Sequence, residues 1–155
     1  MRPRASAALA RVLAPALWLA TMSTASAQAP TAKAVVSDFY ELAFVQGHAV
    51  EAAEKYISPD KYVQHNPQAG DGRQAFIKGF AAFVAQSGYR CQLKHVVAEG
   101  DLVVTHGHCK QHPARRSDRG AAVFDIFRVE QGLITEHWDA EQPVPAKSQN
   151  ANTMF

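Results

Sequence analysis

The hydrophobic pattern changes its period once, at Gly88, and this change constrains the fold more than any other feature of the sequence. Before Gly88, apolar residues recur every three to four positions, which is typical of amphipathic helices. After it, four segments rich in β-branched and apolar residues are separated by short turns. Helices followed by an antiparallel meander predict an α+β domain in which the helices cover one face of a strongly curved sheet. Such a curled sheet leaves a pocket at its open end.

The same pattern gives the expected bounds of the elements. Helices are expected at 34–46, 49–57 and 71–86, and strands at 89–98, 102–111, 121–130 and 133–142. Asp71 is the expected N-cap of the third helix, and 61–64 forms a brief extended segment. A chain of 155 residues has room for one domain. We therefore expect a domain from 34 to 155 with three helices on a four-stranded, mainly antiparallel sheet.

The first 27 residues have the three parts of a secretory signal peptide. These are a basic start, an apolar stretch and a small-residue cleavage site, at Arg2, Arg4 and Arg11, at 12–22 and at Ala25-Ser26-Ala27. The apolar stretch is about half of the roughly 20 residues that a membrane-spanning helix needs. We expect cleavage before Gln28, a flexible leader at 28–33, and a periplasmic or secreted protein without a stable membrane anchor.

The charge balance gives no support for a nucleic-acid partner. Without the three arginines of the expected signal peptide, the 16 basic residues fall to 13, against 14 acidic residues. The densest basic run, 110–119, includes Asp118 and Pro113 and is interpreted as a solvated hairpin end. Nucleic-acid binding depends on neutralising phosphates with clustered Lys and Arg, and this sequence has no such cluster.

Cys91 and Cys109 are the two cysteines of the sequence. They lie on consecutive expected strands, within about one residue of being directly opposite each other, and an oxidising compartment favours a disulfide between them. A shift of one residue would instead point their side chains to opposite faces of the sheet. Two buried free thiols are therefore the other interpretation.

Alternation along the last two strands places His and Asp side chains on one face, because residues two apart point the same way. His137 and Asp139 share a face of the last strand, and Asp125 and Phe127 share a face of the strand before it. A three-residue hairpin at 130–132 would pair Asp125 with His137. A desolvated carboxylate beside a neutral imidazole is suited to act as a general base near neutral pH.

A His-x-His pair on the second strand adds to this expected site. If the face of Val104 is concave, His106 and His108 join the pocket, and His65 lies on a loop that closes over its mouth. Zinc is an alternative, with His106, His108 and either His65 or His137 as ligands. The leading interpretation is acid–base chemistry without a metal or other cofactor. The sequence has no nucleophile elbow or glycine-rich phosphate loop.

Three segments together resemble the SnoaL-like polyketide cyclase family of the nuclear-transport-factor-2-like superfamily. They are Tyr62-Val63-Gln64-His65-Asn66-Pro67, 125–132 and Glu136-His137-Trp138-Asp139, and the ending at 150–155 is also similar to this group. The resemblance covers 34–155 and implies a cone-shaped α+β barrel. It also implies a cofactor-independent proton transfer on a small apolar carbonyl compound, in which Asp139 matches the general base of the cyclases. Asp125 stands fourteen residues before it, where the cyclases carry a histidine.

The resemblance leaves two classes of function open. The first is an enzyme for aldol-type cyclisation, isomerisation or dehydration, with Asp139, His137 and Asp125 as catalytic residues. Its substrate would contact His65, His106, His108, Phe127 and Tyr62. The second is a non-catalytic module that binds a small ligand or takes part in assembly, since the superfamily contains both. The resemblance also implies a homodimer formed through the convex face of the sheet, where Phe124, Ile126 and Trp138 alternate with the pocket residues. Packing of these side chains against the protein's own C-terminal tail is the alternative.

Overall fold

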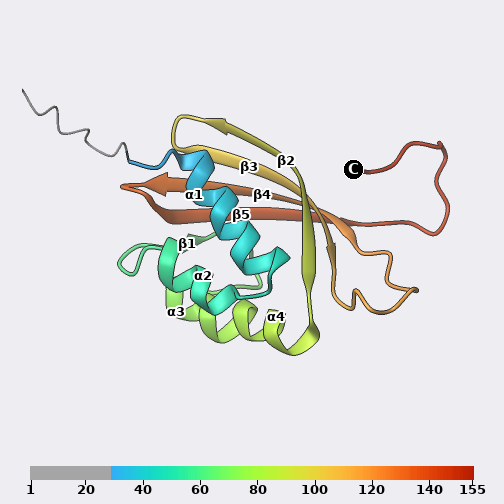
Figure 1. The fold of residues 1–155 in the computed structure, drawn as a ribbon, viewed down its shortest axis with the longest axis horizontal. Helices are drawn as coiled ribbons and strands as arrows, with labels where there is room; N and C mark the ends of the chain where they lie inside the picture. Colours follow the sequence, from blue (N-terminus) through green and yellow to red (C-terminus); the bar gives the residue numbers. More distant parts are fainter. Residues whose placement is uncertain (1–28) are drawn as a thin grey trace, which may run out of the picture.

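The computed structural model describes residues 29–155, so the expected signal peptide at 1–27 lies outside the described residues. The chain forms three helical segments and then a meander of long strands (Figure 1). The helical segments are α1 with η1, α2, and α3 with η2 and α4. Their bounds are α1 Ala32–Tyr40, η1 Glu41–Val45, α2 Ala49–Tyr56, α3 Arg73–Phe76, η2 Ile77–Ala81 and α4 Ala82–Ser87. The strands are β1 Val63–Gln64, β2 Arg90–Glu99, β3 Leu102–Lys110, β4 Ala121–Glu130 and β5 Leu133–Pro143.

The helical segments begin and end at residues with clear local causes. The Thr31 side chain accepts from the backbone N–H of Ala34, so α1 starts within the expected leader at 28–33. Gly47 has a φ of 84° and stops the first segment, as expected. The expected N-cap of the third segment is wrong. Gly72 holds that position, because the Asp71 carboxylate instead accepts from the backbone N–H of Gln64.

No helix of residues 29–155 is long and apolar enough to cross a bilayer.

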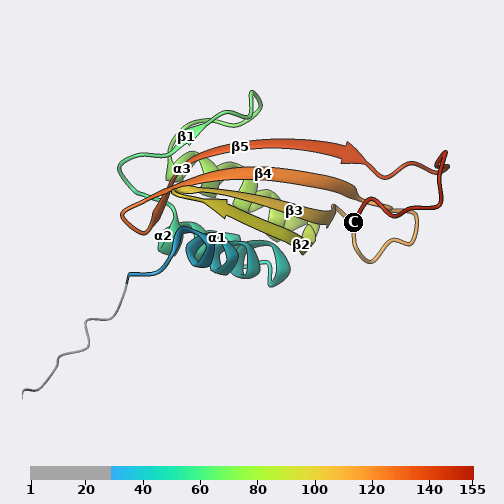
Figure 2. The ribbon, with the colours of Figure 1, turned by 90° about the horizontal axis from the view of Figure 1, so that it is seen from above.

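The sheet has five strands in the order β1-β5-β4-β3-β2, and Figure 2 shows the helices beneath it. β2 to β5 form the expected antiparallel meander. The expected four-stranded sheet lacked β1, which pairs with β5 in parallel and places Gln64 opposite His137. Two residues are too few to show a period in the sequence. This short strand brings the loop after it alongside β5.

The register between β4 and β5 differs from the expected one. Asp125 lies opposite Asp139, and Phe127 lies opposite His137, so the expected pairing of Asp125 with His137 is wrong. The hairpin turns through two residues, Gln131 and Gly132, which both have positive φ, and a bulge follows. The difference from the expected register is two residues, and a shift of two keeps every side chain on its face.

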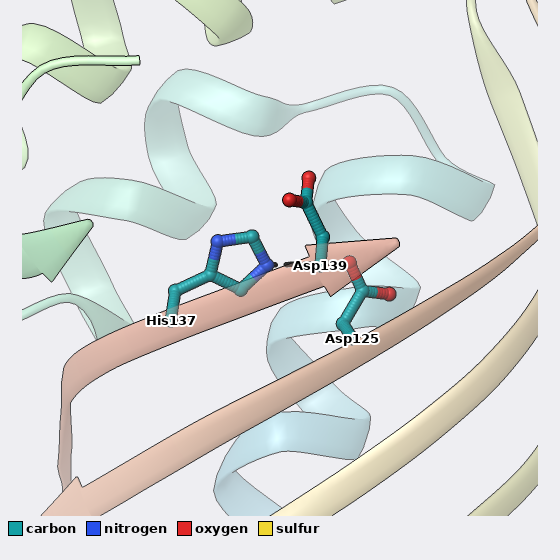
Figure 3. A group of neighbouring side chains, drawn as sticks. All are labelled: Asp125, His137 and Asp139. Carbon is teal, nitrogen blue, oxygen red and sulfur yellow. Dashed lines mark hydrogen bonds and ion pairs between the residues drawn. The ribbon is translucent and has the colours of Figure 1, made fainter. Parts of the chain in front are cut away.

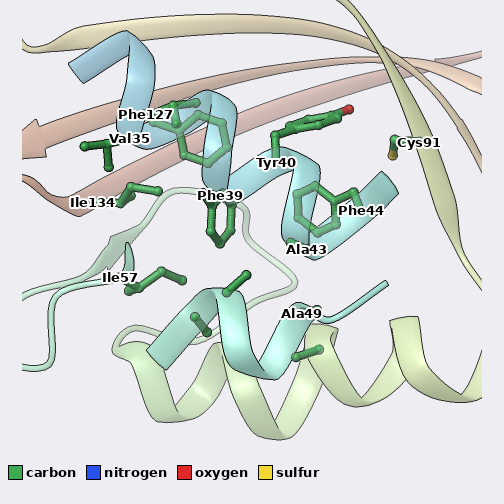
Figure 4. Packing of buried hydrophobic residues seen from close by; sticks show 14 of the residues in the cluster. Val35, Phe39, Tyr40, Ala43, Phe44, Ala49, Ile57, Cys91, Phe127 and Ile134 are labelled. Carbon is green, nitrogen blue, oxygen red and sulfur yellow. The ribbon is translucent and has the colours of Figure 1, made fainter. Parts of the chain in front are cut away.

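The core lies between the concave face of the sheet and the first helical segment (Figure 4). Phe39 and Tyr40 are almost fully buried, and the Phe39 ring contacts the rings of Phe44 and Phe127 edge-on. Gly107 on β3 leaves room for Tyr40, because a Cβ at this glycine would overlap the tyrosine hydroxyl. The Tyr40 hydroxyl lies 3.5 Å from Cys109 Sγ. Packing of α1 on the sheet thus reaches the cysteines.

Candidate functional site

A cavity of about 660 Å³ lies between the helices and the concave face of the sheet. Aromatic residues are the largest group in its wall, and polar residues come from β4, β5 and the loop after β1. The aromatic residues are Phe39, Tyr40, Phe44, Tyr62, Phe76, Phe80, Phe83, Tyr89 and Phe127. The polar part includes Asp125, His137, Asp139, Gln64 and Asn66. This size and composition are typical of small-molecule sites, in which a few polar groups orient an apolar ligand.

His137 and Asp125 form the buried part of the polar wall (Figure 3). His137 Nε2 lies 3.2 Å from Asp125 Oδ1, and the other carboxylate oxygen accepts from the Thr105 hydroxyl at 2.8 Å. The side chains of His137 and Asp125 are 12% and 10% exposed. Both oxygens of Asp125 therefore have partners, and this carboxylate is held in one orientation.

Asp139 is the exposed carboxylate of the site. It lies on β5 two residues after His137, so both side chains point to the same face (Figure 3). The Asn66 side-chain amide donates to its two oxygens at 2.9 Å each. Among residues 29–155, no Lys or Arg forms an ion pair with Asp125 or Asp139. Asp139 can therefore exchange its amide partner for a ligand at the cavity mouth.

Tyrosine hydroxyls supply neutral donors to the cavity. Tyr62 is 5% exposed, and burial together with the nearby Asp125 and Asp139 raises its pKa. Burial is also the main cause of the raised pKa of Tyr40 and of Tyr89. These three hydroxyls stay protonated at neutral pH, so each can donate a hydrogen bond but cannot act as a base.

Cys91 and Cys109 form a disulfide in the cavity wall. They are direct cross-strand partners on β2 and β3, and their Cα atoms are 4.0 Å apart. Both side chains are buried and line the cavity. The alternative of two free thiols does not apply, because no cysteine is free within the described part of the chain.

Asp125, His137 and Asp139 are also close enough to consider as metal ligands. One ligand atom from each lies within 4.8 Å of the others. This set differs from the expected zinc ligands, because His106 and His108 lie on the other side of the sheet. A proton shared between His137 and Asp125 explains their close contact more simply than a metal ion does.

The structure places five of the expected site residues at the cavity, namely Asp125, His137, Asp139, Phe127 and Tyr62. It does not place His106 and His108 there. The expected concave face of the second strand is wrong, because Val103, Thr105, Gly107 and Cys109 face the interior. His106 stacks on Phe124, and His108 stacks on Phe155, both on the convex side.

His65 also lies away from the cavity mouth. Its backbone N–H donates to His137 O, which continues the pairing of β1 with β5. Successive residues of an extended chain point to opposite faces, so Gln64 faces the cavity and His65 faces the convex side. There the His65 ring stacks on Trp138, and Nε2 contacts Glu136 at 2.9 Å. His65 cannot close over the pocket in this arrangement.

Sequence reasoning missed Gln64, Asn66 and Thr105 as parts of the site. Gln64 Oε1 lies 3.1 Å from His137 Nδ1, so the imidazole has a partner on each nitrogen. Thr105 is fully buried and holds Asp125. Gln64 and Asn66 stand in the same short segment that carries the family resemblance, and this proximity to His65 was the one available signal.

Comparisons with solved structures show the same fold. TsrD from Streptomyces laurentii has 23% identity and a TM-score of 0.57, over 70% of this chain and 89% of that one. A proposed polyketide cyclase from Acidithiobacillus ferrooxidans has 21% identity and a TM-score of 0.57, over 77% and 91%. A loop-truncation variant of IdmH has 21% identity and a TM-score of 0.59, over 72% and 92%.

Sequence comparison gives the family. No curated protein matches the chain at a significant level. The model of the SnoaL-like domain matches residues 36–137, which is more than half of the chain and includes β1, β4 and His137 of the site. Two further structures of this fold, from Cytophaga hutchinsonii and Mesorhizobium loti, are described as NTF2-like proteins, and their fold agrees with the one that the sequence predicted. The chain therefore belongs to the SnoaL-like domain family.

Proposed function

We propose that this protein catalyses proton transfer without a cofactor on a small apolar carbonyl compound. The reaction class is an aldol-type cyclisation, an isomerisation or a dehydration. One observation carries the proposal: two carboxylates and an imidazole converge within 4.8 Å at the polar part of a cavity whose wall is rich in aromatic residues. The aromatic part would hold the apolar body of the substrate, and the polar part would face its carbonyl group.

Asp139 is the proposed general base. Asp125 has both oxygens occupied by Thr105 and His137, whereas Asp139 is bonded by one side-chain amide. A general base must come within hydrogen-bond reach of the proton that it removes. The exposed position of Asp139 allows this contact, and the sequence resemblance equates it with the general base of the cyclases.

His137 and Asp125 would then act together as the acid. A carbanion formed beside a carbonyl places negative charge on the carbonyl oxygen, and a donor directed at that oxygen stabilises it. His137 is held by Gln64 and Asp125 on its two nitrogens. The pair returns its shared proton to the product when the ligand takes the place of the contact between Nε2 and Asp125, while the Tyr62 hydroxyl is a further donor to the oxygen.

The test is deuterium exchange at the α-carbon, which requires no knowledge of the product. 2-Tetralone, an apolar bicyclic ketone, is incubated in D₂O with the mature protein, and loss of its α-hydrogens is followed by NMR. Asp139→Asn should lower the catalysed exchange rate by about 10²- to 10⁴-fold, the range for loss of a general base. Glu136→Gln, a change of the same kind on the convex face, should not lower it. An Asp139→Asn variant that exchanges as fast as the wild type would rule out this role.

Ligand binding without catalysis is the second candidate, and the large aromatic share of the cavity wall favours it. Calorimetric titration with 2-tetralone separates the two. Binding with no exchange above the buffer rate supports a binding module, and in that case Asp139→Asn should change only the affinity.

Export is proposed on the sequence of the first 27 residues. Expression of the full chain in a bacterium with a periplasm, followed by fractionation and mass spectrometry, should give a periplasmic protein beginning at Gln28. A full-length protein in the cytoplasm would contradict it.

Homodimer formation is proposed through the convex face. Four apolar side chains there are partly exposed, namely Val97, Val104, Phe124 and Ile126, and contiguous apolar surface often marks an interface. Light scattering should give twice the mass of the mature chain, and Ile126→Arg should give the monomer. A wild-type monomer at high concentration would rule out the dimer.

A further inference from the structure

The loop after β1 holds two side-chain amides against the site. Its base is closed by two hydrogen bonds, both at 2.8 Å. Gln64 N–H donates to the side-chain oxygen Oδ1 of Asp71, and Gly72 N–H donates to the backbone oxygen of Tyr62. The pairing of β1 with β5 sets Gln64 opposite His137. The positions of Gln64 and Asn66 are thus determined by the backbone.

The orientation of each amide follows from a backbone donor. A backbone N–H can only donate, so the atom that accepts it must be the amide oxygen. Asn66 N–H donates to Gln64 Oε1 at 3.0 Å, and Gln68 N–H donates to Asn66 Oδ1 at 2.8 Å. The NH₂ group of Gln64 then faces the Tyr62 hydroxyl at 3.4 Å, and that of Asn66 faces Asp139.

The oxygen of Gln64 decides the tautomer of His137. Because Gln64 Oε1 is an acceptor, His137 Nδ1, 3.1 Å away, must carry a hydrogen. A neutral ring would then present the bare lone pair of Nε2 to Asp125 Oδ1 at 3.2 Å, and two acceptors at this distance repel each other. One further proton therefore lies between His137 and Asp125, bonded to one of the two.

The amide of Asn66 favours an Asp139 carboxylate that carries no proton, in contrast to the pair of His137 and Asp125. Both Asp139 oxygens accept from the same NH₂ group at 2.9 Å, and a protonated carboxyl would direct its own hydrogen at that donor. Hydrogen bonds to the charged form favour it. Gln64 also donates to the Tyr62 hydroxyl, whose own hydrogen is left to point to another acceptor, such as the carbonyl oxygen of a ligand.

We infer that Gln64 and Asn66 are positioning residues that decide which groups of the site act as acid and which as base. Gln64 makes the pair of His137 and Asp125 the proton donor, and Asn66 keeps Asp139 as the acceptor. The inference rests on the proposed proton transfer for its catalytic meaning, but the proton positions themselves are a property of the free protein.

The proton positions are tested by NMR of the imidazole nitrogens in ¹⁵N-labelled mature protein, with His137→Gln used to assign the signals. In the wild type, Nδ1 of His137 should be protonated at neutral pH. Gln64→Met removes the acceptor at similar size, so the ring should change to the tautomer with its hydrogen on Nε2, facing Asp125. Gln64→Glu keeps an acceptor oxygen and should keep the hydrogen on Nδ1. Gln74→Met, an exposed change on α3, is the control.

A wild-type His137 with an unprotonated Nδ1 would overturn the inference whatever the activity. So would a Gln64→Met variant with the wild-type tautomer. A dispersed amide spectrum for each of the three glutamine variants shows that the variant is folded. A changed tautomer can then be told from a failure to fold.

The catalytic consequence is tested with the 2-tetralone exchange assay. Gln64→Met should lower the maximal exchange rate on the order of 10²-fold, as expected when an acid–base group holds its proton on the wrong atom, with little change in affinity for the ketone. Asn66→Asp, which sets a carboxylate against Asp139, should shift the pH profile of exchange toward higher pH. If Gln64→Met changes the tautomer but not the exchange rate, the positioning role in catalysis is wrong. If Asp139→Asn still exchanges, the proposed function fails while the tautomer result stands.

Discussion

The two faces of the sheet carry the same residue types in opposite electrostatic settings. On the concave face, the side chains of His137 and Asp125 are 12% and 10% exposed, and no Lys or Arg of the described residues pairs with the carboxylate. On the convex face, His65 and Glu136 are 40% and 20% exposed. There Arg128 lies 2.7 Å from Glu136 and 2.7 Å from Asp101, so the acidic groups are already neutralised.

This difference shows what enclosure by the helices adds to a His–carboxylate pair. Arg128, with His65 as a second partner, holds the pKa of Glu136 below its ordinary value, so this carboxylate does not take up protons near neutral pH. Within residues 29–155, Asp125 and Asp139 lack such a guanidinium partner, and they line the cavity together with aromatic side chains. A carboxylate without a fixed cation is available to a ligand, whereas one in a network of ion pairs serves to hold the surface together.

The largest expected contrast between the faces is in packing. Phe127 and Phe124 lie on the same strand, but Phe127 is 2% exposed and Phe124 is 48% exposed. Phe127→Ala should lower the free energy of unfolding by about 3 to 5 kcal/mol, because it leaves a cavity in the core. Phe124→Ala should cost about 1 kcal/mol or less. Urea unfolding of both variants measures the contrast, and equal losses would mean that the two faces are not packed as described.

The disulfide gives the second largest effect and sharpens the contrast, because it lies in the concave wall. Its two cysteines are 18 residues apart, and closing a loop of this length contributes about 3 kcal/mol. The double variant Cys91→Ala/Cys109→Ala should unfold at a correspondingly lower urea concentration. Addition of a reductant should destabilise the wild type and leave the double variant unchanged. A wild type that does not respond to complete reduction, verified by thiol titration, would contradict the prediction.

The smallest effect concerns pH and the convex face. Because the pKa of folded Glu136 is lowered, its ion pairs contribute fully above its ordinary pKa of 4.5 and are lost as the pH falls through the lowered value. Glu136→Gln should therefore reduce the free energy of unfolding at pH 7 by about 1 kcal/mol or less, as for other exposed pairs. The difference from the wild type should vanish in acid. A difference that persists at pH 2 would show that the loss is not electrostatic.

The faces of β4 and β5 could be predicted because a register shift of two residues leaves each side chain on the same face. The expected three-residue hairpin gave Asp125 the wrong partner, yet the register differed by two residues and left His137 and Asp139 on the correct face. A one-residue error would have moved the whole site to the convex side. Turn chemistry sets register, and two consecutive residues with positive φ, one of them Gln131, are not an obvious turn signal.

The face of β3 could not be predicted from alternation alone, because alternation groups residues without saying which group is buried. The convex group includes Leu102, the largest apolar side chain of the strand, and its two histidines suggested a pocket. The interior group is formed by smaller residues, since the helices approach β3 closely.

Gln64 and Asn66 were missed for another reason: their position depends on a two-residue parallel strand, which leaves no periodic signal.

The segment His106-Gly107-His108 has an instructive consequence for engineering this scaffold. Its two histidines point to the convex side of the sheet. The glycine between them faces the interior, where there is no room for a side chain. Any side chain at Gly107 would displace Tyr40 from the sheet and, with it, the hydroxyl that lies against Cys109. Libraries that seek new ligands or reactions should therefore leave the central position untouched, and cavity volume is better adjusted from Tyr40 than from β3.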